Sequence, residues 1–452
     1  MLLGKKREKK EKNKKHGEMQ TGTKDESFEE LQTGAKDAVS FEELFKNALE
    51  GEERQAALYG AGMVAVSVYY AIKALYKNCR ILAFIVSEKY GNPDEIDGVP
   101  VVTLQELDRT DVKILVAAPE NHHSAIIREL ERRNLRDYVC IDSRAEAWLM
   151  EKYYALLNQS SFSGENRDGG GQKIAGRTGF PLLHTYSKGT EKASLQVYMA
   201  KFYKDKPIGM KYEMPSWMQT IQAGAALTDI HISDIRDDMG ENISAKNVNY
   251  SELSSMYWVG KHGGYGAVDE EETGNGRKDG YGFKNRCSFE AGNECKAEVY
   301  LGLFHYRRIL DVTEEDLYRI GFHGIDVILP YPTIHYPSIS EHHKRYLRDS
   351  DWEAMVQSLK ETAPEYAGKL EEIFSQPYFY NYNMFIARQP VFKAYCDWLF
   401  PILERTEELS SPKGSERADR YIGYLGESLT TLYFMYHRED LKTAHTGRIM
   451  LV

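Results

Sequence analysis

The chain has 452 residues, of which 42% are hydrophobic and 28% charged, a globular composition with room for roughly two or three domains of about 100–200 residues. Its formal net charge of −10 excludes the broad basic surface with which proteins bind duplex nucleic acid. Scattered cysteines without CxxC spacing, no apolar leader and no run of about eighteen apolar residues predict a cytoplasmic protein without a transmembrane segment.

Residues 1–38 are predicted to form a disordered basic tail, because they are highly charged and contain few large apolar side chains. The lysine-rich run from Lys5 to Lys15 is typical of a solvated tail. Peripheral contact with anionic lipid at the inner face of a membrane is the alternative.

Residues 39–150 alternate short apolar runs with helical patterns. This alternation is typical of a parallel sheet covered by helices, so we predict an α/β domain with a Rossmann-like sheet. The expected strands are 56–59, 81–86, 99–102, 114–117 and 138–141.

A glycine turn follows the first expected strand. Gly60 and Gly62 stand between that strand and a helix, where glycines let a nucleotide phosphate approach the helix N-terminus. Glu88 is the acidic residue closest to the end of the second strand, where ribose would bind. No Tyr-x-x-x-Lys or similar pair follows Glu88 within this domain, so NAD is not expected as a cofactor. A domain that only scaffolds stays an equal alternative to nucleotide binding.

This segment resembles the Rossmann-like nucleotide-binding domains at the front of bacterial polysaccharide-biosynthesis proteins. The resemblance depends on the Gly-x-Gly turn, on the step from Asp97 to Val101, and on Leu115 to Pro119 before a helix.

A flexible linker is predicted over residues 158–190, which are rich in Ser and Gly and include three consecutive glycines from Gly169. A second α/β domain is expected over 194–452. Residues 263–293 are Gly-rich and acidic, which predicts a loop inserted at the surface of that domain.

Two polar clusters in the second domain are candidates for donor binding. Asp238 and Asn242 belong to a polar loop suited to ribose hydroxyls or a base edge, although a solvated turn explains them equally well. Asn249 and Glu252 stand near the start of a helix that also carries Tyr257 and Trp258. A helix cap and a core face are the alternatives there.

Two further polar clusters stand next to apolar strands, one after a strand and one before a strand. His305, Arg307 and Arg308 come directly after an apolar run, and guanidinium groups pair bidentately with phosphate. Surface ion pairs are the alternative for these arginines. Asn383 precedes an apolar strand and would place its amide at a pocket floor, with Glu427 on a helix behind it.

Taken together, these residues resemble the family catalogued as domain of unknown function 4422, which is found in capsular and exopolysaccharide gene clusters and regarded as glycosyltransferases. The resemblance covers residues 195–437. Its ordered matches are Gln222–Ala225, Asp238–Ser244, Ser251–Leu253, Tyr257–Trp258, Gly302–Arg308, Asp326–Pro330, Tyr382–Ile386, Tyr395–Phe400 and Arg420–Glu427.

The resemblance implies a GT-A-like α/β domain that transfers a sugar from a nucleotide sugar, with a UDP-sugar favoured, to a glycan or lipid-linked glycan acceptor. Polysaccharide assembly machinery is an implied partner. Two other functions stay open: a non-catalytic nucleotide-sugar-binding scaffold, and an NAD-dependent sugar-nucleotide oxidoreductase or epimerase that works through the glycine turn.

The same analogy assigns roles to residues. Glu427 is the first candidate for the catalytic base and Asp238 the second. No Asp-x-Asp stands where GT-A enzymes bind a divalent metal, so no metal ligand is assigned and the need for a metal stays open. The expected donor-binding residues are Asn242, Asn249, Glu252, Tyr257, Trp258, His305, Arg307, Arg308 and Asn383.

Overall fold

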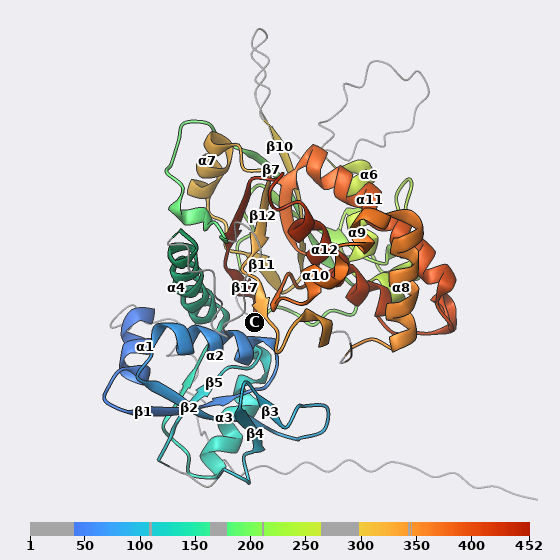
Figure 1. The fold of residues 1–452 in the computed structure, drawn as a ribbon. Helices are drawn as coiled ribbons and strands as arrows, with labels where there is room; N and C mark the ends of the chain where they lie inside the picture. The colour runs from blue at the N-terminus through green and yellow to red at the C-terminus, as the bar shows by residue number, and fades with distance from the viewer. Residues whose placement is uncertain are drawn as a thin grey trace, which may run out of the picture. The chain divides into compact units, whose positions relative to one another are not determined.

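The computed structural model describes residues 40–107, 111–162, 179–209, 212–263, 298–341, 344 and 346–452. The predicted tail (1–38) and residues 264–293 of the predicted insertion lie outside this set. The chain divides into two units, Met1–Leu44 and Phe45–Val452, and both large β-sheets belong to the second unit (Figure 1).

The first sheet has the order β3-β4-β2-β1-β5-β6, and its neighbouring strands are parallel except for the β3–β4 pair. This confirms the predicted parallel α/β sheet. The buried Ala and Leu side chains of β1 agree with its position in the middle of the sheet. Helices cover both faces of a central strand in a parallel sheet, so its side chains are buried on both sides. The strands are β1 (Arg54–Tyr59), β2 (Cys79–Val86), β3 (Glu95–Ile96), β4 (Val99–Thr103), β5 (Lys113–Val116) and β6 (Tyr138–Cys140). The helices of this part are α1 (Phe41–Leu49), α2 (Met63–Leu75), α3 (His123–Arg132) and α4 (Ser143–Phe162).

The glycine turn between β1 and α2 needs glycine at only one of its two positions. Gly60 has φ = 130°, and a Cβ there would lie 2.7 Å from the carbonyl oxygen of Ala117. Gly62 has φ = −87°, and a Cβ there would meet nothing within 4 Å.

We therefore expect Gly60→Ala to lower the free energy of unfolding by at least about 1–3 kcal/mol, because it combines a left-handed φ with a close backbone contact. Gly62→Ala is the matched control and should stay within about 0.5 kcal/mol. Urea denaturation of both variants measures the difference. If Gly60→Ala and Gly62→Ala have equal free energies of unfolding, the turn accommodates a Cβ at residue 60 without loss of stability.

The segment predicted as a flexible linker, residues 158–190, is ordered at both of its ends. Helix α4 runs on to Phe162, and the side-chain amide of Asn158 donates to the carbonyl of Phe180 and accepts from its N–H. Phe180 and Leu183 are buried. The Gly/Ser composition of the middle concealed these contacts, and residues 163–178 lie outside the described part of the chain.

The second sheet is mixed, with the order β16-β12-β15-β10-β7-β8-β9, and β11 pairs with both β10 and β17. Strand β10 is parallel to β7 and antiparallel to β15. The strands are β7 (Ser194–Lys201), β8 (Met218–Gln222), β9 (Ile235–Arg236), β10 (Val299–His305), β11 (Arg308–Leu310), β12 (Val327–Pro330), β15 (Phe385–Arg388), β16 (Thr443–Thr446) and β17 (Arg448–Met450). A separate two-stranded sheet pairs β13 (Thr333–Ile334) with β14 (Tyr378–Phe379).

Helices cover both faces of this sheet. Helix α7 lies on one face and α6, α11 and α12 lie on the other (Figure 1). Strand β10 serves both cores, because Leu303 packs into one cluster and Phe304 into the other. The helices are α5 (Asn247–Tyr250), α6 (Leu253–His262), α7 (Glu314–His323), α8 (Asp349–Thr362), α9 (Pro364–Ala367), α10 (Leu370–Phe374), α11 (Gln389–Leu409) and α12 (Tyr421–Tyr436).

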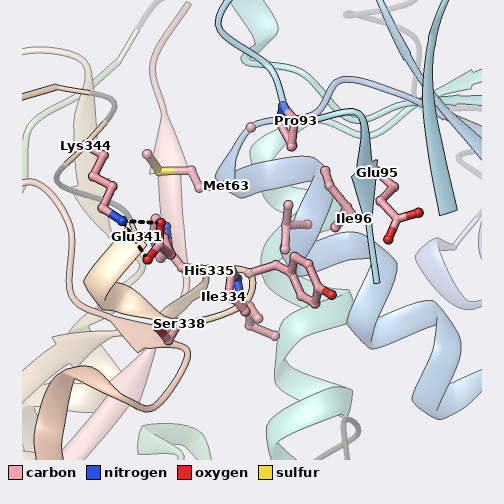
Figure 2. Close-up of a pocket in the computed structure, with 13 residues that line it drawn as sticks. Met63, Pro93, Glu95, Ile96, Ile334, His335, Ser338, Glu341 and Lys344 are labelled. Carbon is pink, nitrogen blue, oxygen red and sulfur yellow. Dashed lines mark hydrogen bonds and ion pairs between the residues drawn. The ribbon is translucent and has the colours of Figure 1, made fainter. Parts of the chain in front are cut away.

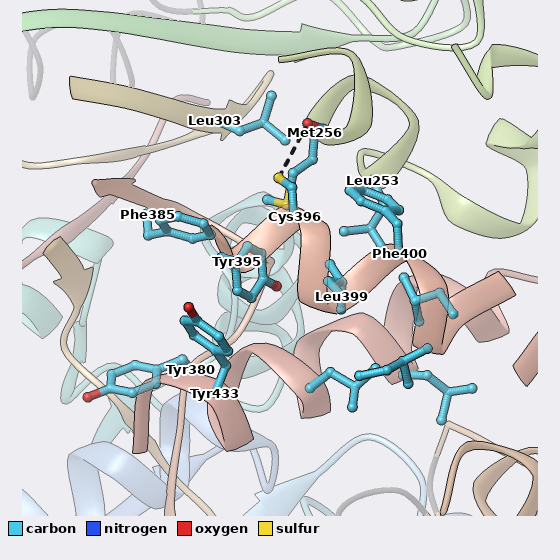
Figure 3. Close-up of a cluster of buried hydrophobic side chains, with 14 of the residues drawn as sticks. Leu253, Met256, Leu303, Tyr380, Phe385, Tyr395, Cys396, Leu399, Phe400 and Tyr433 are labelled. Carbon is cyan, nitrogen blue, oxygen red and sulfur yellow. Dashed lines mark hydrogen bonds between the residues drawn. The ribbon is translucent and has the colours of Figure 1, made fainter. Parts of the chain in front are cut away.

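The larger core joins α6 and α11 to the sheet. Figure 3 shows Leu253 and Met256 of α6 close to Phe400 and Cys396 of α11, with Phe385 of β15 beside them. All five side chains are buried. This packing fixes the start of α6 and the end of β10 against each other, which determines where the polar side chains at those positions meet.

Buried hydrogen bonds join the two sheets within the second unit. The Tyr154 hydroxyl donates to the carbonyl of Pro332 at 2.7 Å, and the Ile334 N–H donates to the hydroxyl of Ser67 at 2.9 Å. The Met450 N–H donates to the Ser143 hydroxyl at 2.8 Å. In the described residues, no helix combines the length and the apolar character that crossing a membrane requires.

Candidate functional site

Polar side chains from four elements meet at the carboxyl end of β10. His305 is the last residue of β10, Asn383 precedes β15, Glu252 precedes α6, and Glu427 lies in the second turn of α12. All four were predicted as site residues. Three of them, Glu252, Asn383 and Glu427, are buried, and the fourth is nearly so.

Glu252 is the centre of this cluster. One carboxylate oxygen accepts from the Asn383 amide at 2.9 Å and lies 3.5 Å from His305 Nε2, while the other accepts from Arg420 at 3.1 Å. Burial alone would raise the pKa of Glu252, but His305, Arg420 and Asn383 outweigh it and lower the pKa to about 2. Glu252 is therefore a permanent anion near neutral pH.

Asn383 is fixed by the protein around it. Its amide also donates to the carbonyl of Gly423 at 3.2 Å, and its oxygen accepts from the Thr430 hydroxyl at 3.1 Å. Both Asn383 and the preceding Tyr382 have left-handed φ angles, of 49° and 72°. Such angles are uncommon for residues other than glycine and are enriched at functional sites. The amide thus orients Glu252.

Glu427 is a buried carboxyl whose pKa is raised toward neutral pH. Burial raises the pKa of Glu427 to about 7, with a further contribution from the nearby Glu252 anion. Arg420, a backbone hydrogen bond from Tyr382, and Arg308 act in the opposite direction. A carboxyl whose pKa lies near the working pH can both take up and release a proton.

The side chains of Arg307 and Arg308 have different surroundings. The Arg308 guanidinium lies 4.5 Å from the ring centroid of Tyr382, and its charge acts on Glu427. The Arg307 guanidinium lies 4.8 Å from the ring of Tyr306 instead. The structure therefore brings Arg308 to the cluster and separates it from Arg307, because Arg308 begins β11 and Arg307 lies in the preceding turn.

The polar loop after β9 is organised by Asp237 and not by the two residues singled out in it. Asp237 is fully buried and accepts from the N–H groups of Gly224 and Ala225 and from the Ser254 hydroxyl. The predicted second base, Asp238, lies 3.3 Å from Arg236, and the Asn242 amide donates to the carbonyls of Asp238 and Gly240. In this structure Asn242 is thus engaged in holding its own turn.

The remaining predicted donor residues make structural contacts. The Asn249 amide donates to the carbonyls of Arg417 and Asp419, which holds the loop before α12. The Tyr257 hydroxyl donates to Glu241 at 2.6 Å. The indole N–H of Trp258 donates to the carbonyl of Met239 at 2.8 Å, and its ring is buried.

Sequence reasoning missed several members of the site. Arg420 stands directly before α12 and pairs with Glu252, yet no role was predicted for it. No role was predicted for Tyr382 either. Arg448 and Glu146, from β17 and α4, form a buried ion pair at 3.3 Å beside it. No local signal could reveal this pair, because 301 residues separate its members in the chain.

The glycine turn borders a cavity of about 300 Å³ that α2 shares with the segment around 334–344. Figure 2 shows Met63 of α2, Ile96 and Ile334 around this space. Gly62 is part of its wall. Gly60 and Glu88 are not, and Glu88 is exposed to solvent, so only one of the three predicted nucleotide-binding residues lines this cavity.

A metal site was left open by the sequence. Within the described ranges, no three His, Cys, Asp or Glu side chains lie close enough together to hold a metal ion. Cys287 and Cys295, the pair of cysteines that the sequence offers as a metal-binding candidate, lie outside those ranges.

Comparisons with known proteins connect part of the chain to one family. Residues 205–268 and 291–439 match the model of a family described as Domain of unknown function (DUF4422). None of the curated proteins matches the chain. The chain is similar to a solved structure titled "WbbM bifunctional glycosytransferase apo structure", with 22% sequence identity and a TM-score of 0.43. That similarity covers 57% of this chain and 45% of the other, so this chain spans less than half of that protein's length. Over residues 205–268 and 291–439 the chain thus carries a domain similar to a family whose description assigns no function.

Proposed function

We propose that the second domain is a glycosyltransferase that moves a sugar from a nucleotide sugar, with a UDP-sugar favoured, to a glycan or lipid-linked glycan acceptor. The proposal includes a role in capsular or exopolysaccharide biosynthesis, in the cytoplasm and at the inner face of the membrane. Both follow from the sequence resemblance described above.

The observation that carries the proposal is the position of Glu427 between cationic groups. Sugar transfer needs a base for the acceptor hydroxyl and positive charge for the departing diphosphate. Glu427 has a pKa of about 7, and the charges of Arg308 and Arg420 act on it. This arrangement supplies both requirements within one cluster.

The test is direct. The purified chain is incubated with a panel of nucleotide sugars and a mixture of glycan acceptors, and release of nucleoside diphosphate is measured. Acceptor-dependent release from one donor supports the proposal. No release from any donor, by a protein that circular dichroism shows to be folded, contradicts it.

Arg308 should matter more than Arg307 in that assay. We expect Arg308→Ala to lower kcat/KM by roughly 10²–10³-fold, because it removes a preorganised cation from the leaving-group side. Arg308→Lys should restore little, since a point charge does not reproduce the planar fork. Arg307→Ala is the neighbouring comparison and should cause a smaller loss. A larger loss from Arg307→Ala would contradict this assignment.

A second function is favoured by one observation, the cavity that Gly62 and Met63 border. In this alternative the first domain binds a nucleotide and the chain serves as a non-catalytic scaffold. The cavity volume lies at the lower end for small-molecule sites. Calorimetry with nucleotides distinguishes the two functions, because a scaffold binds a nucleotide sugar and releases no diphosphate from it.

A further inference from the structure

Tyr382 touches almost every group of the candidate site. Its carbonyl accepts from His305 Nε2 at 2.6 Å, and its N–H bonds to Glu427. The Arg308 and Arg448 guanidiniums lie 4.5 and 4.9 Å from its ring centroid. These distances are within the range of cation–π attraction.

The two guanidiniums on this ring differ in their freedom. Arg448 is anchored by Glu146 of α4, and the side chains of both residues are only 11% exposed. Arg308 has no carboxylate within ion-pair distance among the residues that the structure describes. Arg448 is thus a fixed structural cation, while the charge of Arg308 stays available to an anion.

The Tyr382 ring therefore provides a face against which the Arg308 guanidinium packs. A guanidinium stacked on an aromatic face keeps its in-plane N–H donors free for an oxyanion. This leaves the charge and the donors of Arg308 able to bind an oxyanion next to Glu427, on which the same charge acts.

We infer that Tyr382 is a positioning residue whose ring orients Arg308 toward the diphosphate of the donor, while Arg448, held by Glu146, contacts the same ring. This inference rests on the proposed function. It adds a role for α4, because Glu146 of that helix anchors Arg448.

The backbone of Tyr382 allows the ring to be tested alone. The contacts to His305 and Glu427 are made by the main chain and survive a side-chain substitution. Asn tolerates the left-handed φ of 72° better than most residues, so Tyr382→Asn removes the ring with little added strain. Tyr382→Phe keeps the ring and removes only the hydroxyl, which contacts Met63 Sδ at 3.7 Å.

The experiment measures the affinity of the full chain for UDP and for inorganic pyrophosphate by calorimetry, together with kcat, KM and melting temperature. Tyr382→Asn should weaken binding roughly 3- to 30-fold, the range that one cation–π contact supports. The apparent pKa in the pH profile of kcat, which reports the ionisation of Glu427, should be unchanged. Tyr382→Phe should restore most of the lost affinity.

A double-mutant cycle with Arg308→Ala completes the test. If the ring acts through Arg308, Tyr382→Asn should cause little further loss of affinity in the Arg308→Ala background. Additive losses, or equal binding by Tyr382→Asn and the parent, overturn the inference while leaving the proposed function intact. A parent chain that binds neither UDP nor pyrophosphate and releases no diphosphate from any nucleotide sugar overturns both.

Discussion

Glu427→Gln is expected to lower turnover by a factor of roughly 10²–10⁴, the contribution of a general base to catalysis. The amide has nearly the shape of the carboxylate, but it cannot take a proton from the acceptor hydroxyl. For the unchanged chain, kcat should rise with pH through about 7, because burial and Glu252 raise the pKa of Glu427 to that value and only the ionised form is a base.

The same substitution should stabilise the protein at alkaline pH. The pKa of Glu427 is raised in the folded protein above the value of about 4.3 in an unfolded chain. Its stabilising contribution is therefore full below about pH 4 and is lost as pH rises through 7. Gln stays neutral and avoids this loss, so Glu427→Gln should gain up to about 3 kcal/mol over the parent at pH 8.

The control for both measurements is the exposed Glu439, which lies just after α12. Glu439→Gln should leave the melting temperature and turnover close to those of the parent. A Glu427→Gln protein that is less stable than the parent at pH 8 would show that Glu427 is charged and paired in the fold. Retention of full turnover would exclude it as the base.

The parts of the fold that sequence patterns predicted are those with local causes. The alternation of apolar strands and helices from Arg54 onward predicted the first sheet, since each strand is marked by its own buried residues. The Gly/Ser-rich linker was predicted from composition too. Its ends are ordered because Asn158 and Phe180 bond across the gap, and a pairwise contact of that kind leaves no trace in composition.

The site was predictable to the extent that its residues end or begin elements. His305 and Asn383 lie at strand ends, and both were singled out because they stand next to apolar strands. In the loop after β9 the sequence pattern does not distinguish Asp237 from Asp238, and only the structure shows that Asp237 is the buried acceptor. Arg448 and Glu146 could not be found, since their pairing depends on the packing of α4 against β17.

Glu252→Gln should have the largest effect on stability in the site. It leaves Arg420 without the anion that now neutralises it. Because the Arg420 side chain is 46% exposed, water screens part of this loss, which should stay below the about 3–5 kcal/mol of a fully buried pair. His305 and Arg420 hold the pKa of Glu252 at about 2, below its unfolded value, despite the opposing effect of burial. The stability gap between the parent and Glu252→Gln should therefore be full above about pH 4.3 and close as pH falls toward 2.

Glu252→Gln should also change the pKa of Glu427. The negative charge of Glu252 is one of the two causes that raise the pKa of Glu427. Removing that charge should lower the pKa of Glu427, so the rise of kcat with pH should begin at a more acidic pH in Glu252→Gln. The shift is read from the pH profile of the nucleoside diphosphate release assay on protein that remains folded.

Asp351→Asn is the matched control for this shift. Asp351 is fully buried and pairs with the buried Arg417 at 2.7 Å, so its loss should destabilise the fold at least as much. It is not among the charges that act on Glu427, and its pH profile should stay unchanged. If Glu252→Gln and Asp351→Asn lower stability alike and neither moves the profile, Glu252 only holds the fold together. If only Glu252→Gln moves the pH profile to more acidic pH, the Glu252 carboxylate raises the pKa of Glu427. A general loss of stability, which both variants share, could not shift the profile in only one of them.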